Sequence, residues 1–181
     1  MRVLLVIWLV LGAGVAAADG LRALGEPGVV ALMRHALAPG TGDPARFDAD
    51  DCSTQRNLDA RGRAQARRTG EAMRAAGVTF DLVWSSQWCR ARDTARLLEM
   101  GPVQERPPLN SFFAGRGDRA AQTARTLALI EALPPDTRLL IVTHQVNITA
   151  LTGRAVASGE IIVTRRTADG PEPVGRFVIA P

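Results

Sequence analysis

The stretch Val29–Ala36, VVALMRHA, decides how the fold is interpreted. Its first five residues are apolar, which is typical of a short strand that is buried on both faces of a sheet. Directly after them come Arg34, which is permanently charged, and His35, which titrates near neutral pH. Such groups at the end of a buried strand conflict with the demands of a core, and conflicts of this kind are expected at functional sites. We therefore predict that the strand ends in a site.

Strands and helices alternate along the rest of the chain. The expected strands lie at 29–34, 80–84, 138–144, 160–166 and 175–180, the last two being weaker and nearer a sheet edge. The expected helices lie at 58–77, 89–100, 120–133 and 145–153, and a long polar loop lies at 38–54. Asp59 is a suitable N-cap and Gly77 a suitable end for the first of these helices. The alternation predicts an α/β fold, a three-layer α/β/α sandwich with a mostly parallel central sheet.

The residues that follow the three buried strands are expected at one place. In sheets of parallel strands, ligands bind beyond the carboxyl ends of the strands. Arg34 and His35 follow the first strand, Arg90 lies shortly after the second, and His144 follows the third. The topology thus brings both histidines of the chain and two arginines to the same edge of the sheet.

Two arginines and two histidines around one point suit a dianionic ligand. The guanidinium group matches the oxygens of a phosphate and stays charged at any working pH. A neutral imidazole among cations can act as a nucleophile that accepts a phosphoryl group and passes it to water. Because phosphoryl transfer depends mainly on positioning and charge stabilisation, this set predicts a phosphatase without a metal or other cofactor. The histidines and cysteines are too far apart in the sequence for a metal-ligand pattern.

Residues 1–18 have the pattern of a secretory signal peptide. Arg2 is followed by an uninterrupted apolar run, and small residues precede a cleavage point after Ala18. The apolar run is shorter than the ~20 residues of a membrane-spanning helix, and a retained anchor is the alternative. We expect cleavage to leave one domain, 19–181, in the oxidising bacterial periplasm, without stable membrane insertion.

The charge distribution bears on nucleic-acid binding, and the two cysteines bear on whether the chain contains a disulfide. The formal net charge is +4, but the arginines are scattered among acidic residues, so nucleic-acid binding is not expected. Cys52 and Cys89 both lie in the expected mature chain, where two cysteines suggest one disulfide that would tether the long loop over the site. Two buried thiols are the alternative, and the spacing does not decide between them.

Four motifs in the same order resemble those of the histidine phosphatase superfamily, which has a phosphoglycerate-mutase-like fold. The first strand of that family ends in Arg-His-Gly, and here it ends in RHA at 34–36. The family's Leu-Thr-x-x-Gly helix start resembles LDARG at 58–62, and its Ser-Ser-x-x-x-Arg-Ala-x-x-Thr-Ala motif resembles SSQWCRARDTA at 85–95. The last motif is a strand that ends in Thr-His, and it matches TH at 143–144.

The resemblance implies a role for each matching residue. His35 would be the nucleophile that becomes phosphohistidine, while Arg34, Arg90 and His144 would bind the phosphoryl oxygens. The two serines at 85–86 would cap the helix that carries Arg90.

Three positions depart from the family pattern. Ala36 and Gln145 each stand where the family has glycine, and both add a side chain near the site. Ser111 stands where many members carry the glutamate that protonates the leaving oxygen. Because general acid catalysis contributes ~10²–10⁴ in rate, its loss should favour good leaving groups. Asp43 and Asp118 are the alternative sources of the proton.

The expected function is hydrolysis of a phosphomonoester or a phosphoramidate, with a phosphorylated small molecule or a cell-envelope phosphate as substrate. Family members that act on protein phosphohistidine have a leaving group that needs little acid catalysis. Exported members that dephosphorylate the heptose of lipopolysaccharide resemble this chain in their short length and Arg-His-Ala strand end. A phosphate-binding protein without turnover is the alternative function, and both the missing glutamate and the expected export argue against a mutase.

Overall fold

A mixed sheet of six strands forms the centre of the fold. The computed structural model describes residues 20–181, so the expected signal peptide at 1–18 lies outside the described residues. The strands are β1 (Val29–Arg34), β2 (Leu82–Ser85), β3 (Val103–Glu105), β4 (Leu139–Thr143), β5 (Ile161–Thr167) and β6 (Gly170–Phe177). Their order in the sheet is β3-β2-β4-β1-β5-β6. The first four strands of this order pair in parallel, whereas β5 runs antiparallel to β1 and β6 antiparallel to β5.

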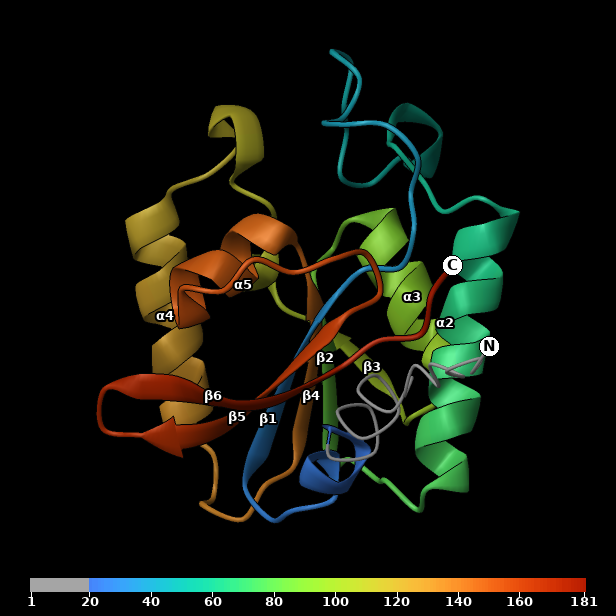
Figure 1. Ribbon diagram of the computed structural model, residues 1–181. Helices are drawn as coiled ribbons and strands as arrows, with labels where there is room; N and C mark the ends of the chain where they lie inside the picture. The colour runs from blue at the N-terminus through green and yellow to red at the C-terminus, as the bar shows by residue number, and fades with distance from the viewer. Residues whose placement is uncertain (1–19) are drawn as a thin grey trace, which may run out of the picture.

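Helices cover both faces of this sheet. They are α2 (Ala60–Ala75), α3 (Cys89–Leu98), α4 (Arg119–Glu131) and α5 (Gln145–Thr152), with short 3₁₀ helices η1 (Cys52–Thr54), η2 (Pro107–Leu109) and η3 (Phe113–Gly115) in the connections. Figure 1 shows α2 and α3 on one side of the strands and α4 and α5 on the other. The structure thus confirms the three-layer sandwich with a mostly parallel sheet. Within residues 20–181, no helix combines the length and the apolar character needed to cross a membrane.

Alternate residues of β1 enter two different cores, which is the reason this strand is apolar from Val29 to Met33. Val29, Ala31 and Met33 pack with residues of α2 and α3, whereas Val30 and Leu32 pack with residues of α4 and α5. The strand is also hydrogen-bonded to a neighbour on each edge, β4 and β5. Packing on both faces and pairing on both edges hold the end of β1 rigidly, as a site that needs accurate placement requires.

The chain just beyond β1 is held by residues of α2 and α3. The Ala36 N–H donates a hydrogen bond of 3.0 Å to Thr94 Oγ1 on α3, and the Leu37 N–H donates one of 2.9 Å to Gln65 Oε1 on α2. Helix α2 approaches so closely that a Cβ at Gly62 would lie 1.9 Å from the Leu37 carbonyl oxygen. The glycine of LDARG is therefore required by packing beside the strand end rather than by helix formation.

The ends of the helices agree with the sequence in part. Asp59 is the N-cap of α2 and accepts a hydrogen bond of 2.7 Å from the Gly62 N–H, as predicted. Gly77, the expected end, follows the C-cap of the same helix with a φ of 73°. The prediction that Ser85 and Ser86 cap α3 is wrong, because Trp88 is the N-cap and its own side chain makes no capping hydrogen bond. The strand β3 was not predicted, since it has only three residues, and two of them are exposed. The last strand, expected at 175–180, lies instead at Gly170–Phe177, because its first half pairs with the end of β5.

Cys52 and Cys89 form a disulfide, which confirms that interpretation over two buried thiols. Cys52 begins η1 at the end of the long polar loop, and Cys89 begins α3, directly before Arg90. The bond therefore joins the loop that follows β1 to the helix that carries a predicted site residue.

Removing this disulfide should destabilise the protein strongly. The bond closes a loop with a sequence separation of 37 residues, which restricts the unfolded chain and corresponds to about 4 kcal/mol of stability. We expect the variant Cys52→Ser/Cys89→Ser to melt about 8–16 °C lower than the wild type. Wild-type protein melted with excess dithiothreitol serves as the control and should reach the same temperature. An unchanged melting temperature, with two thiols shown to be free, would contradict the prediction.

Candidate active site

The four predicted site residues line one cavity beyond the carboxyl ends of the parallel strands. Arg34 ends β1 and His35 follows it, Arg90 lies in the first turn of α3, and His144 follows β4. The cavity has a volume of about 220 Å³. Its other lining residues are Gly40, Thr41, Gly42, Arg56, Ser111, Phe113, Gln145 and Val146.

The imidazole of His35 is oriented by a hydrogen bond on each ring nitrogen. Its Nδ1 lies 2.8 Å from the Ala36 carbonyl oxygen. A carbonyl only accepts, so Nδ1 carries the proton and Nε2 carries a lone pair. That lone pair accepts a hydrogen bond of 3.2 Å from Arg90 Nε. The ring is buried, with 2% of the residue exposed. Burial, followed by the charge of Arg90, holds the pKa of His35 well below its ordinary value, so the ring is neutral at neutral pH.

His144 lies beside His35, with its ring held by a serine. The two imidazole centroids are 5.5 Å apart, and His144 Nε2 lies 2.9 Å from Ser86 Oγ. The indole of Trp88 meets the His144 ring edge-on at 5.6 Å. The pKa of His144 lies well below its usual range, mainly because the ring is buried and secondly because of the charge of Arg90. Ser86 thus positions a site histidine instead of capping a helix.

Two neutral buried histidines should make the stability of the protein depend on pH. A histidine with a lowered folded-state pKa binds more protons when the chain unfolds. The free energy of unfolding should therefore be at its full level above about pH 6.5. It should fall as the pH drops below that value, by up to about 1.4 kcal/mol per pH unit for each histidine.

Thermal melts in non-phosphate buffers between about pH 7.5 and pH 5 would measure this slope. As an independent check, the Cε1–H signals of His35 and His144 in NMR should not titrate near 6.5. Melting that is flat across this range, together with ordinary histidine titration, would contradict both lowered pKa values.

Arg90 is held by a buried carboxylate from the long loop. Its Nη1 and Nη2 donate hydrogen bonds of 2.7 and 3.1 Å to the two oxygens of Asp43. The side chains are 3% and 5% exposed, respectively. Burial by itself raises the pKa of Asp43, but the hydrogen bonds and charge of Arg90 outweigh it, and the net pKa lies below the usual range. Asp43 is therefore ionised at neutral pH.

Two further arginines line the cavity, and the sequence predicted only one of them. Arg34 donates from Nη1 to the Val156 carbonyl oxygen at 3.1 Å. Arg56 was missed, because it follows η1 in a loop, where no strand-end rule singles out one arginine among many. Its side chain donates to the carbonyl oxygens of Gly42, at 2.8 Å, and Ala38. Burial and the charge of Arg90 lower the pKa of Arg56 to about 10, so it remains charged at neutral pH.

Neither of the two suggested proton donors faces the cavity. Asp43 lies on Arg90 and is not among the residues that line the space. Asp118 is exposed and is the N-cap of α4, where it accepts from the Ala121 N–H at 2.9 Å. Ser111, at the position of the family's glutamate, does line the cavity. Within residues 20–181, the lining thus contains three arginines and two histidines but no carboxylate.

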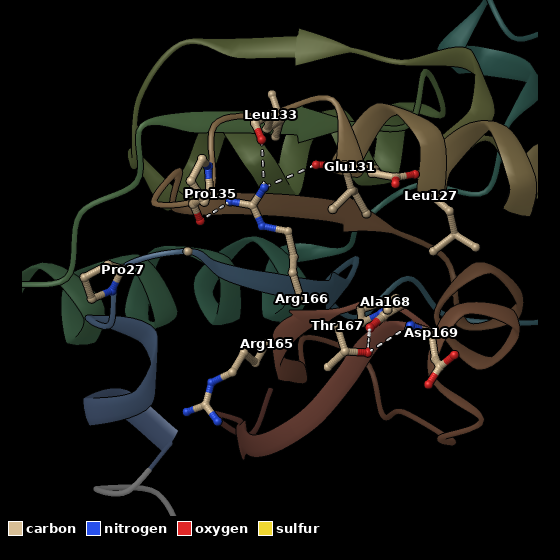
Figure 2. Close-up of a pocket in the computed structure, with 14 residues that line it drawn as sticks. Pro27, Leu127, Glu131, Leu133, Pro135, Arg165, Arg166, Thr167, Ala168 and Asp169 are labelled. Carbon is tan, nitrogen blue, oxygen red and sulfur yellow. Dashed lines mark hydrogen bonds between the residues drawn. The ribbon is translucent and has the colours of Figure 1, made fainter.

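A larger cavity lies at the opposite end of β1, between α4 and the β5–β6 hairpin (Figure 2). Its volume is about 650 Å³, and Gly28 at its wall directly precedes β1. Arg166, one of the charged residues that line this cavity, donates to the carbonyl oxygens of Ile130 in α4 at 3.3 Å and of Leu133, just beyond α4, at 3.1 Å. Arg166 thus satisfies the helix end, and none of the predicted site residues lies in this cavity.

Comparisons with known proteins agree with the fold and the motifs. The family model of the histidine phosphatase superfamily (branch 1) matches residues 30–118. No curated protein is significantly similar to the chain. Three solved structures share the fold at low sequence identity. The protein histidine phosphatase SixA complexed with tungstate is 18% identical with a TM-score of 0.61, and the alignment covers 83% of this chain and 96% of SixA.

The other two structures are phosphatases by their descriptions. A candidate alpha-ribazole-5'-P phosphatase from Escherichia coli is 20% identical with a TM-score of 0.62, covering 86% of this chain and 97% of that one. A mycobacterial glucosyl-3-phosphoglycerate phosphatase is 18% identical with a TM-score of 0.56, covering 76% and 90%. The solved structures show that the chain shares their fold, and the family-model match over residues 30–118 shows that the chain belongs to the histidine phosphatase superfamily.

Proposed function

We propose that this protein is a metal-independent phosphatase that hydrolyses a phosphomonoester or a phosphoramidate through a covalent phosphohistidine on His35. One observation carries the proposal. The unprotonated Nε2 of a buried, neutral His35 lies at a cavity lined by Arg34, Arg56 and Arg90. A lone pair held among three cations suits attack on a dianionic phosphoryl group.

The arrangement allows a two-step reaction. In the first step, the phosphoryl oxygens accept hydrogen bonds from the arginines, and one of these oxygens replaces His35 Nε2 as the acceptor of the Arg90 Nε–H, while the guanidinium keeps its orientation. His35 Nε2 then forms a bond to phosphorus, and the bond to the leaving group breaks with its electron pair on that group. In the second step, water attacks the phosphohistidine, the P–N bond breaks, and inorganic phosphate is released. His144 contributes a further contact to the phosphoryl oxygens.

The lining favours substrates whose leaving group needs little protonation. Among the described residues, the cavity wall lacks a carboxylic acid that could protonate a leaving alkoxide. A phosphoramidate such as phosphohistidine fits this limitation, and the similar structure of SixA is described as a protein histidine phosphatase. A reactive phosphate of a small molecule or of the cell envelope fits as well.

We also propose that the protein acts in the periplasm. The sequence pattern at 1–18 supports export, and a disulfide between Cys52 and Cys89 suits an oxidising compartment.

Hydrolysis of 4-nitrophenyl phosphate by the purified protein in excess EDTA tests the proposal. We expect steady release of nitrophenol and phosphate that EDTA does not reduce. If no turnover occurs but calorimetry detects binding of inorganic phosphate, the protein is the phosphate-binding module of the same fold. Activity that EDTA abolishes and a divalent metal restores would contradict the metal-independent mechanism.

A further inference from the structure

Asp43 is a buried charged group that the proposed reaction does not use. We propose that Asp43 is a positioning residue that fixes the guanidinium of Arg90 so that its Nε–H points at the nucleophilic nitrogen of His35. The inference rests on the proposed function, since it assigns a role within that reaction. Arg90 is the group through which Asp43 acts, and Asp43 itself touches neither the cavity nor the substrate.

Both carboxylate oxygens of Asp43 are fully hydrogen-bonded. Its two oxygens accept four hydrogen bonds, two of them from the Arg90 guanidinium. The other two come from the Trp88 indole Nε1 and the Arg56 backbone N–H, both at 3.1 Å. A carboxylate with this many donors is saturated, which leaves little room for it to carry a proton. The bidentate pair also fixes the plane of the guanidinium, which a single hydrogen bond would not do.

The loop that supplies Asp43 is itself tied to α3. The ring of Phe47 stacks on the Trp88 indole with centroids 4.7 Å apart. The Gln55 side chain accepts a hydrogen bond of 2.9 Å from the Cys89 N–H, and Cys89 forms the disulfide with Cys52. These contacts place the carboxylate on Arg90 from the side of the loop, while the cavity lies on the side of His35.

Loss of the Asp43 charge should affect kcat and the inhibition constant for phosphate differently. A loosened guanidinium no longer meets the transition state in a fixed geometry, so kcat should fall by about 10²-fold. Removing a negative charge beside three arginines leaves the cavity more cationic, so the inhibition constant for inorganic phosphate should not rise. A merely structural defect would instead weaken both turnover and phosphate binding.

The central experiment compares Asp43→Asn with Asp50→Asn, a matched change at an exposed carboxylate of the same loop. We expect the kcat of Asp43→Asn to fall by the same factor for 4-nitrophenyl phosphate and for phosphate esters of less acidic alcohols. In an Arg90→Ala background, Asp43→Asn should cause little further loss. Asp50→Asn should match the wild type throughout.

Three other outcomes of this experiment would overturn the positioning role of Asp43. A loss that grows as the leaving alcohol becomes less acidic would make Asp43 the proton donor and overturn the inference. Equal losses with and without Arg90 would also overturn it, because Asp43 would then act independently. Unchanged kinetics in Asp43→Asn, with an active wild type, would overturn it while the proposed function stands.

NMR of the His35 ring, which needs no turnover, tests the positioning role of Asp43 separately from the proposed phosphatase function. If the wild type itself is inactive, the proposed function fails, and the NMR signals of the His35 ring still report on Arg90. We expect Asp43→Asn to shift these signals and Asp50→Asn to leave them in place. Unshifted His35 signals in a folded Asp43→Asn protein would rule out the positioning role.

Discussion

Replacing His35 with alanine should reduce the turnover of 4-nitrophenyl phosphate by at least about 10⁴-fold. In the structure, Nε2 of His35 is unprotonated and lies 3.2 Å from Nε of Arg90, at a cavity that three arginines line. Without it, no phosphoryl-enzyme forms, and the remaining cations can only assist direct attack by water. Steady-state kinetics on the folded variant would measure the loss.

The covalent intermediate gives this prediction a second measurement. Rapid quenching of wild-type protein during turnover of ³²P-labelled substrate should trap a label that is stable in base and lost in acid, as phosphohistidine is. His144→Ala provides the matched comparison, because it removes an imidazole from the same cavity but keeps the nucleophile. That variant should be slower but should still be labelled. A label on Ser85 or Ser86, or none during fast turnover, would contradict the assignment of His35.

The nature of the leaving group should change the rate by ~10²–10⁴. 4-Nitrophenol leaves without protonation, whereas a simple alcohol needs a proton as the bond to phosphorus breaks. Since Ser111 occupies the cavity where many family members have a glutamate, the alkoxide receives no help from a carboxylic acid there. We therefore expect kcat/KM for 4-nitrophenyl phosphate or phosphoramidate to exceed that for an alkyl phosphate by this factor.

The variant Ser111→Glu tests the same idea from the opposite direction. Adding the missing acid should speed hydrolysis of the alkyl phosphate and leave hydrolysis of 4-nitrophenyl phosphate nearly unchanged. The ratio of the two kcat/KM values should therefore decrease. Ser111→Gln is the matched control, because it has the same size without a transferable proton. Equal wild-type rates for both substrate types would show that another group supplies the proton and would contradict the prediction.

Local sequence patterns accounted for most of the fold and for the place of the predicted site residues at one edge of the sheet. The apolar run of β1, the N-cap at Asp59 and the end of α5 at Gly153 depend on near neighbours in the chain, and the structure has them where the patterns predicted. Parallel pairing of β1, β2 and β4 then places Arg34, His35 and His144 at one edge by topology alone. These features follow from periodicity and from the geometry of a parallel sheet, which need no side-chain detail.

Contacts between distant loops could be decided only by the tertiary structure. Asp43 and Arg90 are 47 residues apart, and Ser86 and His144 are 58 apart. The first pair forms because the loop after β1 folds onto α3, which no local pattern indicates, and the second forms because the neighbouring parallel strands β2 and β4 end side by side. The sequence by itself determined the sheet apart from its edge strand β3 and the bounds of β6, together with the helices and the strand ends at which the predicted site residues lie. Only packing decided that Asp43 holds Arg90, that Arg56 joins the cavity and that Cys52 meets Cys89, because these side chains meet through folding of irregular segments.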